Sequence, residues 1–105
     1  MKVLTVCQGG NCRSVACAYV LKYGLGIDAI ACGWEGNRPE TLAMLAAWAD
    51  RIIVMQSAFV EKIPAEHHNK LCVYDVGEDR WFNSLHPELV GIVKNMIGQD
   101  PFWTL

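Results

Sequence analysis

The feature that most constrains the fold is a regular alternation of short apolar runs with segments of helix-forming residues. Apolar runs rich in β-branched residues predict strands over 2–6, 27–32, 51–55 and 71–75. Helices are predicted between and after them, over about 14–23, from 39 onward, over 57–63 and from 87 onward. Strands that alternate with helices form a parallel sheet with helices on both faces. The sequence therefore predicts a three-layer α/β/α fold around a four-stranded parallel sheet.

Glycine and proline residues mark the expected helix ends. Gly24 and Gly26 should stop the first helix, and Pro64 the third. Pro39 and Pro87 are suitable first-turn residues for the second and fourth. The last helix should bury the apolar residues that recur at helical spacing, which are Leu89, Ile92, Val93, Met96 and Ile97.

Length and composition narrow the class of protein. The 105 residues suit a single domain over 1–105, and a hydrophobic content of 52% is enough for a real core. With a net charge of -2 and no run of Lys or Arg, neither nucleic acid nor a membrane is an expected partner. The apolar run at the N-terminus is too short for a secretory signal, so a cytoplasmic location is expected.

Five cysteines need an explanation that does not involve a disulfide framework. They are Cys7, Cys12, Cys17, Cys32 and Cys72. An odd number without a secretory signal argues against disulfides, and the five-residue spacing of the first three does not match a zinc site. His67 and His68 lie in a polar stretch that is expected to be a solvated loop. Cys17, Cys32 and Cys72 are expected to be ordinary core residues.

The turn after the first strand carries the chemistry. It delivers the Cys7 thiol to the carboxyl edge of the sheet, where ligands bind in such folds. Gly9 and Gly10 allow the backbone to turn its N–H groups inward, and the next helix points its N-terminus into the same space. Arg13 supplies a planar fork for two phosphate oxygens. The predicted phosphate-binding residues are Gln8, Gly9, Gly10, Asn11, Cys12, Arg13 and Ser14.

This positive environment also favours a Cys7 thiolate, to which Ser14 can donate a hydrogen bond. The thiolate, the inward N–H groups and Arg13 together form a nucleophile beside an anion site. The alternative interpretation gives the two residues no function: Cys7 would be a buried thiol at a strand end, and Arg13 a surface residue on a helix. The paired glycines and the strand–turn–helix context favour the nucleophile.

The chain resembles the low-molecular-weight protein tyrosine phosphatases. Their C-x5-R-S loop follows the first strand, as Cys7 to Ser14 does here. The stretch ADRIIVM resembles that family's third strand, and EDRWF its acid loop. The resemblance implies the phosphotyrosine protein phosphatase I-like fold, which is flavodoxin-like or Rossmann-like. It also implies a phosphocysteine intermediate on Cys7 and a phosphorylated protein or small phosphomonoester as substrate. No cofactor or metal is expected, because Arg13 and the loop amides carry the charge.

The general acid is expected in the loop after the fourth strand. Asp79 is the first choice, with Asp75 and Glu78 as alternatives. Asp100 opens an Asp-Pro-aromatic-aromatic sequence like that of the resembled family. The last helix, however, should carry it about 15–18 Å away, to the opposite edge of the sheet.

The resemblance and the aromatic residues also suggest how the loops work. Trp81 and Phe82 are expected to wall the substrate pocket, and Trp34 to form the opposite wall or to anchor its loop on the sheet. In the resembled family, a second loop cysteine can pair reversibly with the nucleophile. Cys12 is the candidate for that role, or it only packs under the loop.

Departures from the family pattern leave other functions open. Gly10 and Asn11 stand where the family commonly has Asn and an aliphatic residue, and Asp79 lacks the following Pro. Relatives with a small polar residue at position 11 include phosphoarginine phosphatases, which makes that activity an alternative. Arsenate reductase is a second, although only Cys72 is available downstream for its thiol relay. A non-catalytic phosphoryl-binding module is a third.

Overall fold

The structure is a computed structural model that describes residues 1–103. The strands are β1 (Lys2–Cys7), β2 (Asp28–Gly33), β3 (Arg51–Val54) and β4 (Leu71–Val73). The α-helices are α1 (Arg13–Leu25), α2 (Pro39–Trp48) and α3 (Pro87–Gln99), and two 3-10 helices, η1 (Ser57–Lys62) and η2 (Ala65–Lys70), precede β4. All strand pairs are parallel, in the order β2-β1-β3-β4. The predicted four-stranded parallel sheet is confirmed.

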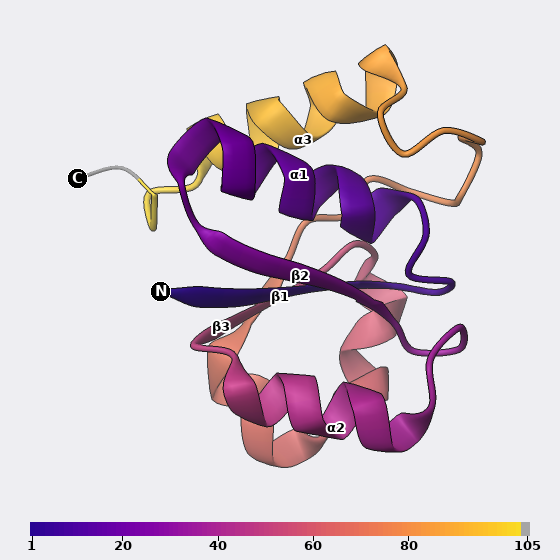
Figure 1. Cartoon of the computed structure of the whole chain (residues 1–105), viewed down its shortest axis with the longest axis vertical. Helices are drawn as coiled ribbons and strands as arrows, with labels where there is room; N and C mark the ends of the chain where they lie inside the picture. The colour runs from indigo at the N-terminus through magenta and orange to yellow at the C-terminus, as the bar shows by residue number, and fades with distance from the viewer. Residues whose placement is uncertain (104–105) are drawn as a thin grey trace.

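The helices cover both faces of the sheet, as predicted for a three-layer α/β/α fold. Figure 1 shows α1 and α3 over one face, and α2 with the two 3-10 helices over the other. The central strands β1 and β3 are buried along almost their whole length. The edge strand β2 mixes buried with exposed residues, and β4 is half-buried to exposed. Continuous apolar runs such as IIV in β3 are typical of strands that are covered on both sides.

The strand register aligns the carboxyl ends of the strands at one edge. Cys7 pairs with Gly33, and Val54 pairs with Val73, so the loops that follow these strands gather there. In Figure 1 the β1–α1 loop and the start of α3 lie at this edge, and the N-terminus and the end of α3 lie near the other. Consistent with this, Asp100 at the end of α3 pairs with Arg51, the first residue of β3, at 2.8 Å. Asp100 therefore lies away from the β1–α1 loop, as the helix length predicted.

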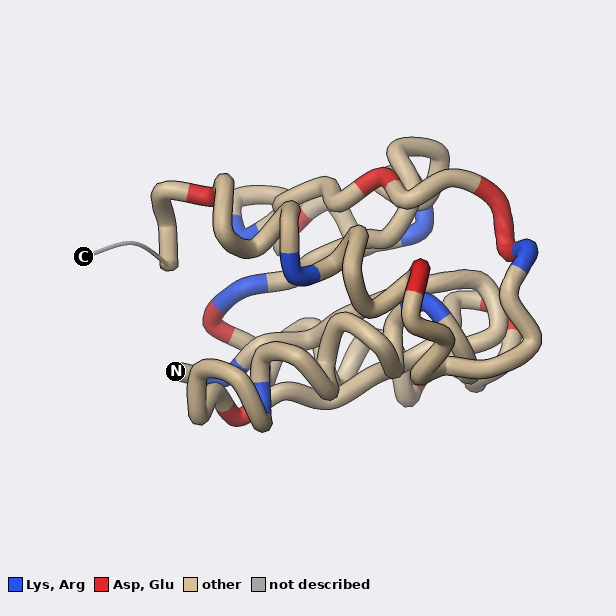
Figure 2. The backbone as a smooth tube through the Cα atoms, turned by 90° about the horizontal axis from the view of Figure 1, so that it is seen from above, with Lys and Arg blue, Asp and Glu red and all other residues tan. Residues whose placement is uncertain are grey.

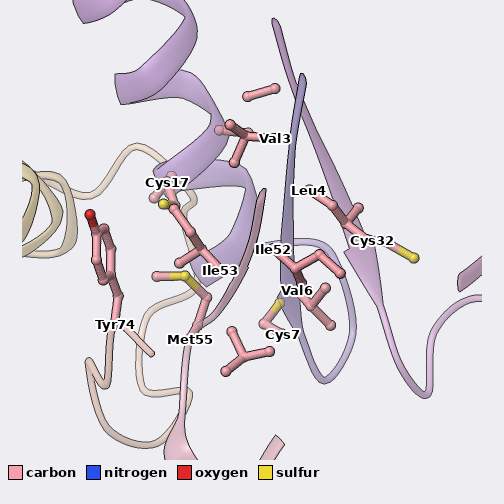
Figure 3. Packing of buried hydrophobic residues seen from close by; sticks show 14 of the residues in the cluster. Val3, Leu4, Val6, Cys7, Cys17, Cys32, Ile52, Ile53, Met55 and Tyr74 are labelled. Carbon is pink, nitrogen blue, oxygen red and sulfur yellow. The ribbon is translucent and has the colours of Figure 1, made fainter. Parts of the chain in front are cut away.

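The core is continuous across the sheet (Figure 3). Ile53 and Met55 lie on the side of the sheet where Cys17 of α1 packs, while Leu4 and Ile52 lie on the opposite side. Among the three cysteines predicted to be core residues, Cys17 and Cys32 are buried and Cys72 is half-buried.

Several element ends differ from the prediction. α1 runs from Arg13 through Gly24 to Leu25 and ends at Gly26, whose left-handed φ of 67° makes it the C-cap. β3 and β4 end at Val54 and Val73, before the predicted residues 55 and 75. The prediction for β4 fails because the Asp75 carboxylate accepts hydrogen bonds from nearby backbone N–H groups and turns the chain.

A second correction concerns residues 65–70, which were predicted to be a solvated loop and form the helix η2. Pro64 ends the preceding segment, and the chain then enters a new 3-10 turn. The His68 Nε2 atom lies 2.7 Å from the carbonyl oxygen of Ile63, and the His67 side chain is only 16% exposed. His67 is therefore half-buried, whereas His68 is exposed and contacts the fold through one ring nitrogen.

Acidic and basic positions are interspersed along the backbone (Figure 2). Within residues 1–103, no group of three or more His, Cys, Asp or Glu side chains is arranged to hold a metal ion. No helix in the same range has the length and hydropathy needed to cross a membrane.

Candidate active site

Cys7 lies at the carboxyl end of β1 and is only 2% exposed. The backbone N–H of Gly10 donates a hydrogen bond to its Sγ atom over 3.2 Å. The Ser14 hydroxyl oxygen, in the first turn of α1, lies 3.0 Å from the same sulfur. Donors that point at a sulfur stabilise its thiolate, and the N-terminus of α1 adds a partial positive charge. The surroundings of Cys7 therefore suit a nucleophilic thiolate.

Gly10 is required by the path of the loop. Its φ of 75° is in the left-handed region, and a Cβ atom there would meet the Gly33 nitrogen at 2.5 Å. Gly33, which pairs with Cys7 at the end of β2, is equally tight against the Gly9 and Gly10 backbone. Two backbones approach each other directly at this point, which only glycine permits.

Hydrogen bonds from the β2–α2 loop hold this packing in place. The carbonyl oxygen of Cys7 accepts from the Trp34 N–H at 3.0 Å, and that of Gln8 accepts from the Glu35 and Gly36 N–H groups at 3.0 and 3.1 Å. The Gln8 side chain donates to the Glu35 carboxylate at 2.9 Å. The backbone carbonyls therefore point toward the β2–α2 loop, which leaves N–H groups available to the other side.

Arg13 is 1% exposed, and its guanidinium is fixed at one end. The Nη1 atom donates to Gln56 Oε1 at 2.8 Å and to the Gly77 carbonyl at 2.9 Å, and the guanidinium lies 5.2 Å from the Phe59 ring. The Nε atom is buried and has no hydrogen-bond partner among residues 1–103. A buried donor without a partner is costly, and a phosphate oxygen would satisfy it. Arg13 is thus oriented as an anion-binding fork.

Asp79 lies beside the loop cysteines. Burial raises the pKa of the Cys12 thiol, and the charges of Asp79 and Cys7 raise it further, while Arg13 opposes them. A side-chain hydrogen bond between Asp79 and Cys12 contributes to the same shift. The four groups are therefore within interaction range of one another. The structure brings together the predicted nucleophile, phosphate ligand and first-choice acid, while their catalytic roles stay predictions.

The two alternative acids differ from Asp79 in their surroundings. Asp75 accepts hydrogen bonds from the backbone N–H and hydroxyl of Ser57 and from the Gly77 N–H, at 2.9–3.0 Å. The Ser57 and Gly77 donors, with a smaller effect from Arg13, lower the pKa of Asp75. It is therefore ionised near neutral pH and engaged in holding the loop. Glu78 is exposed, next to Asp79 in sequence.

The three predicted pocket aromatics lie in different environments. Trp81 is buried, with 5% exposure, whereas the neighbouring Phe82 side chain is fully exposed. Trp34 is half-buried and packs against Phe59, with ring centroids 5.7 Å apart, and Lys62 lies over its other side. Trp34 thus packs on η1, and the two roles predicted for it, pocket wall or anchor on the sheet, stay predictions. The role of Trp81 and Phe82 as walls stays a prediction.

Cys12 is buried under the loop, and its Sγ donates to the Trp81 carbonyl at 3.3 Å. All five cysteines are free thiols. Asn11, next to Cys12, is exposed on the loop. The pairing of Cys12 with Cys7 under oxidation stays a prediction.

Sequence reasoning missed the residues that hold the site from other loops. Gln56 follows β3 and fixes Arg13, and its position just beyond a strand's carboxyl end is a signal that could have found it. Gly33 and Gly36 bracket the turn after β2, and a glycine pair there could have indicated a close backbone approach. Glu88 contacts the acid loop from α3, and no local pattern marks it.

Comparison with solved structures shows which proteins share this fold. The chain is similar to the tyrosine phosphatase AmsI of Erwinia amylovora, with 16% identity, a TM-score of 0.69, and coverage of 90% of this chain and 86% of that one. It is similar to a low-molecular-weight phosphotyrosine phosphatase of Vibrio cholerae, with 18% identity, a TM-score of 0.62, and coverage of 90% and 88%. It is also similar to the YwlE arginine phosphatase of Geobacillus stearothermophilus, with 18% identity, a TM-score of 0.62, and coverage of 93% and 91%.

No protein-family model matches the sequence, and no curated protein matches it. The likeness is therefore one of structure, extends over about nine tenths of each chain, and persists at low sequence identity. This chain has the fold of the low-molecular-weight protein tyrosine phosphatases.

Proposed function

We propose that this protein is a cysteine-dependent phosphomonoester hydrolase of the protein tyrosine phosphatase type. One observation carries the proposal. The Cys7 thiol accepts a hydrogen bond from a backbone N–H, and at the other end of the same turn lies a buried Arg13 whose Nε atom has no hydrogen-bond partner in the described part of the chain. A phosphate group bound above Cys7 would pair with Arg13 and the inward N–H groups of the loop. The fold shared with solved phosphatases supports the same conclusion.

The proposed reaction has two displacement steps. The Cys7 thiolate attacks phosphorus in line, the bond from phosphorus to the leaving oxygen breaks, and Asp79 gives its proton to that oxygen. Arg13 and the loop amides stabilise the charge on the three equatorial oxygens. Asp79, now a carboxylate, then takes a proton from water as the water oxygen attacks phosphorus. The phosphorus–sulfur bond breaks, which releases phosphate and restores the thiolate and the protonated acid.

The test is hydrolysis of p-nitrophenyl phosphate near pH 6 in the presence of EDTA. Wild type should turn over, Cys7→Ser should be inactive, and Asp79→Ala should be impaired, much more on phenyl phosphate than on p-nitrophenyl phosphate. Absence of turnover in the reduced wild-type protein would contradict the proposal. Turnover that survives Cys7→Ser would contradict the assignment of the nucleophile.

A phosphoarginine phosphatase is the second candidate. It is favoured by the polar Asn11 side chain exposed on the loop and by the likeness to the arginine phosphatase structure. To decide between the two candidates, kcat/KM is measured for O-phosphotyrosine and for phosphoarginine in wild type and in Asn11→Ile. A preference for phosphoarginine that Asn11→Ile weakens would favour this second candidate.

Arsenate reduction is disfavoured by the position of Cys72. A thiol relay needs a second cysteine that can reach Cys7. The Cys72 sulfur lies instead 4.0 Å from Asp100, which pairs with Arg51 at the opposite edge of the sheet.

A non-catalytic phosphoryl-binding module would bind phosphate without turning over any phosphomonoester.

A further inference from the structure

Both residues that follow Asp79 are tied to a single carboxylate oxygen of Glu88. The indole N–H of Trp81 donates to Glu88 Oε1 at 3.1 Å, and the Arg80 Nη2 atom lies 2.8 Å from the same oxygen. The Arg80 guanidinium also lies over the Trp81 ring, 4.4 Å from its centroid. Glu88 itself is in the first turn of α3, where His86 caps the helix and a negative charge is favourable. The three side chains form one unit.

This unit supports the acid loop beside three other anchors, which are the Asp75 hydrogen bonds, the Gly77 carbonyl on Arg13 and the contact of Asp79 with Cys12. Residues 74–86 contain no helix or strand, so side-chain anchors decide the position of Asp79. Trp81 is the buried anchor, and its carbonyl oxygen accepts the Cys12 thiol hydrogen at 3.3 Å. A continuous path of contacts therefore runs from α3 through Glu88 and Trp81 to Cys12 in the phosphate-binding loop.

We propose that Glu88 is a positioning residue that holds Asp79 over the leaving group by fixing Arg80 and Trp81. The proposal rests on the proposed phosphatase function and adds to it the residue that sets the geometry of the acid. Glu88 acts through the two residues after Asp79, and its carboxylate takes no part in proton transfer. An exposed ion pair contributes little to stability, so the expected effect of losing it is on the placement of the acid.

A misplaced acid has a signature that a general loss of folding lacks. A leaving group that is already a weak base departs without protonation, whereas a strongly basic one needs the proton. Loss of Glu88 should therefore lower kcat/KM for phenyl phosphate much more than for p-nitrophenyl phosphate. A loss of folded protein would lower both by the same factor.

The experiment measures kcat/KM for both substrates in wild type, Glu88→Ala, Glu88→Gln and Asp79→Asn. Glu88→Ala is expected to lose about ten- to a hundredfold on phenyl phosphate and much less on p-nitrophenyl phosphate, in the same direction as Asp79→Asn. Glu88→Gln keeps an oxygen for the Trp81 N–H and should recover part of the loss. Equal losses on both substrates, or no loss, would overturn the proposal.

Glu40→Ala is the matched control. Glu40 follows Pro39 at the start of α2 as Glu88 follows Pro87 at the start of α3, and within residues 1–103 its carboxylate pairs only with the exposed Arg38. It should leave both kcat/KM values unchanged. Thermal unfolding of both variants shows whether each remains folded.

A second readout separates this proposal from the proposed function. Limited trypsin cleavage after Arg80 should accelerate by about tenfold in Glu88→Ala and stay unchanged in Glu40→Ala, because the freed loop enters the protease more readily. This measurement needs no phosphorylated substrate, so it decides the positioning role even if wild type hydrolyses neither ester. Unchanged cleavage in Glu88→Ala would overturn the proposal by itself.

Discussion

The backbone of Gly36 packs against the carbonyl group of Gly9 so closely that a Cβ atom at position 36 would lie 2.1 Å from the Gly9 oxygen. Relief of this clash needs a movement of about 1 Å or more in the loop that holds Cys7. A displacement of that size costs about a hundredfold in rate when it moves a reacting group. We therefore expect Gly36→Ala to lower kcat/KM for p-nitrophenyl phosphate by about two orders of magnitude.

The control for this substitution is Gly91→Ala in α3, where an added Cβ atom meets nothing within 4 Å. Alanine is the better helix former, so Gly91→Ala should stabilise the protein by about 0.5–1 kcal/mol without changing kcat/KM. Wild-type activity in Gly36→Ala would show that the contact between the two loops does not position Cys7.

The order and type of the main elements were predictable because the hydrophobic periodicity and the positions of Gly and Pro indicate the same elements over most of the chain. Buried runs such as 51–54 can only be central strands here, and Pro39 and Pro87 do open helices. The helix at 65–70 was missed because its residues carry no apolar period and its end is held by a tertiary contact, the hydrogen bond from Lys70 to the Ala46 carbonyl. The hydrophobic pattern of a segment predicts helices and strands that bury one face. It does not predict short elements that are stabilised by contacts with neighbouring parts of the fold.

The site also contains residues that a local motif predicts and residues that only the tertiary structure places. Cys7 and Arg13 lie in one segment with a recognisable spacing, so the sequence placed them together. Gln56, Gly77 and Glu88 reach the site from three other segments, and their contacts depend on how the loops fold over the sheet edge. Such contacts follow from tertiary structure, which a motif does not encode.

Asp79 and Asp75 should respond differently to substitution. Hydrogen bonds lower the pKa of Asp75, so at pH 6 it is ionised and has no proton to give. Asp79→Ala should lower kcat/KM for phenyl phosphate by about 10²- to 10⁴-fold, the usual contribution of a general acid. Asp75→Ala should have a much smaller effect, through the loss of its bonds to Ser57. The reverse order of the two effects would assign the acid to Asp75.

Arg13→Lys should abolish tight phosphate binding. Lysine carries the charge but lacks the planar fork that reaches Gln56, Gly77 and an anion together. Inorganic phosphate should raise the Tm of wild type and of Cys7→Ser, and should leave that of Arg13→Lys almost unchanged. Equal shifts in all three proteins would place the bound anion elsewhere. A shift in a wild type without turnover would identify a binding module.

We predict that Cys12 protects Cys7 from irreversible oxidation. Hydrogen peroxide converts a thiolate to sulfenic acid and hydroxide, and a neighbouring thiol then condenses with the sulfenic acid to give a disulfide and water. Cys12 lies close enough to Cys7 for the two to interact electrostatically. A peptide map after mild peroxide treatment should contain a Cys7–Cys12 disulfide, and dithiothreitol should restore activity in wild type but not in Cys12→Ser. A map without that disulfide would contradict the protective role.

Asp100 should make stability depend on pH at the edge of the sheet opposite Cys7. Burial alone would raise the pKa of Asp100, but hydrogen bonds from Tyr74, the Phe102 N–H and Arg51 together lower it below its ordinary value of 3.8. A carboxylate whose pKa is lowered by folding stabilises the fold above that ordinary value, and the contribution is lost as the pH falls through the folded-state pKa. Arg51, 11% exposed in its side chain, would be left without this charge in Asp100→Asn.

We expect Asp100→Asn to lower the free energy of unfolding by about 3 kcal/mol at pH 7, the order found when one partner of a buried ion pair is removed. The difference from wild type should shrink as the pH is lowered from 4 toward 2, because wild-type Asp100 then becomes neutral as well. Urea unfolding at pH 7 and pH 3 measures both values, with Asp28→Asn as an exposed control. A difference that stays constant across this range would show that the Asp100 charge does not stabilise the fold, and that shape and hydrogen bonding alone account for the loss.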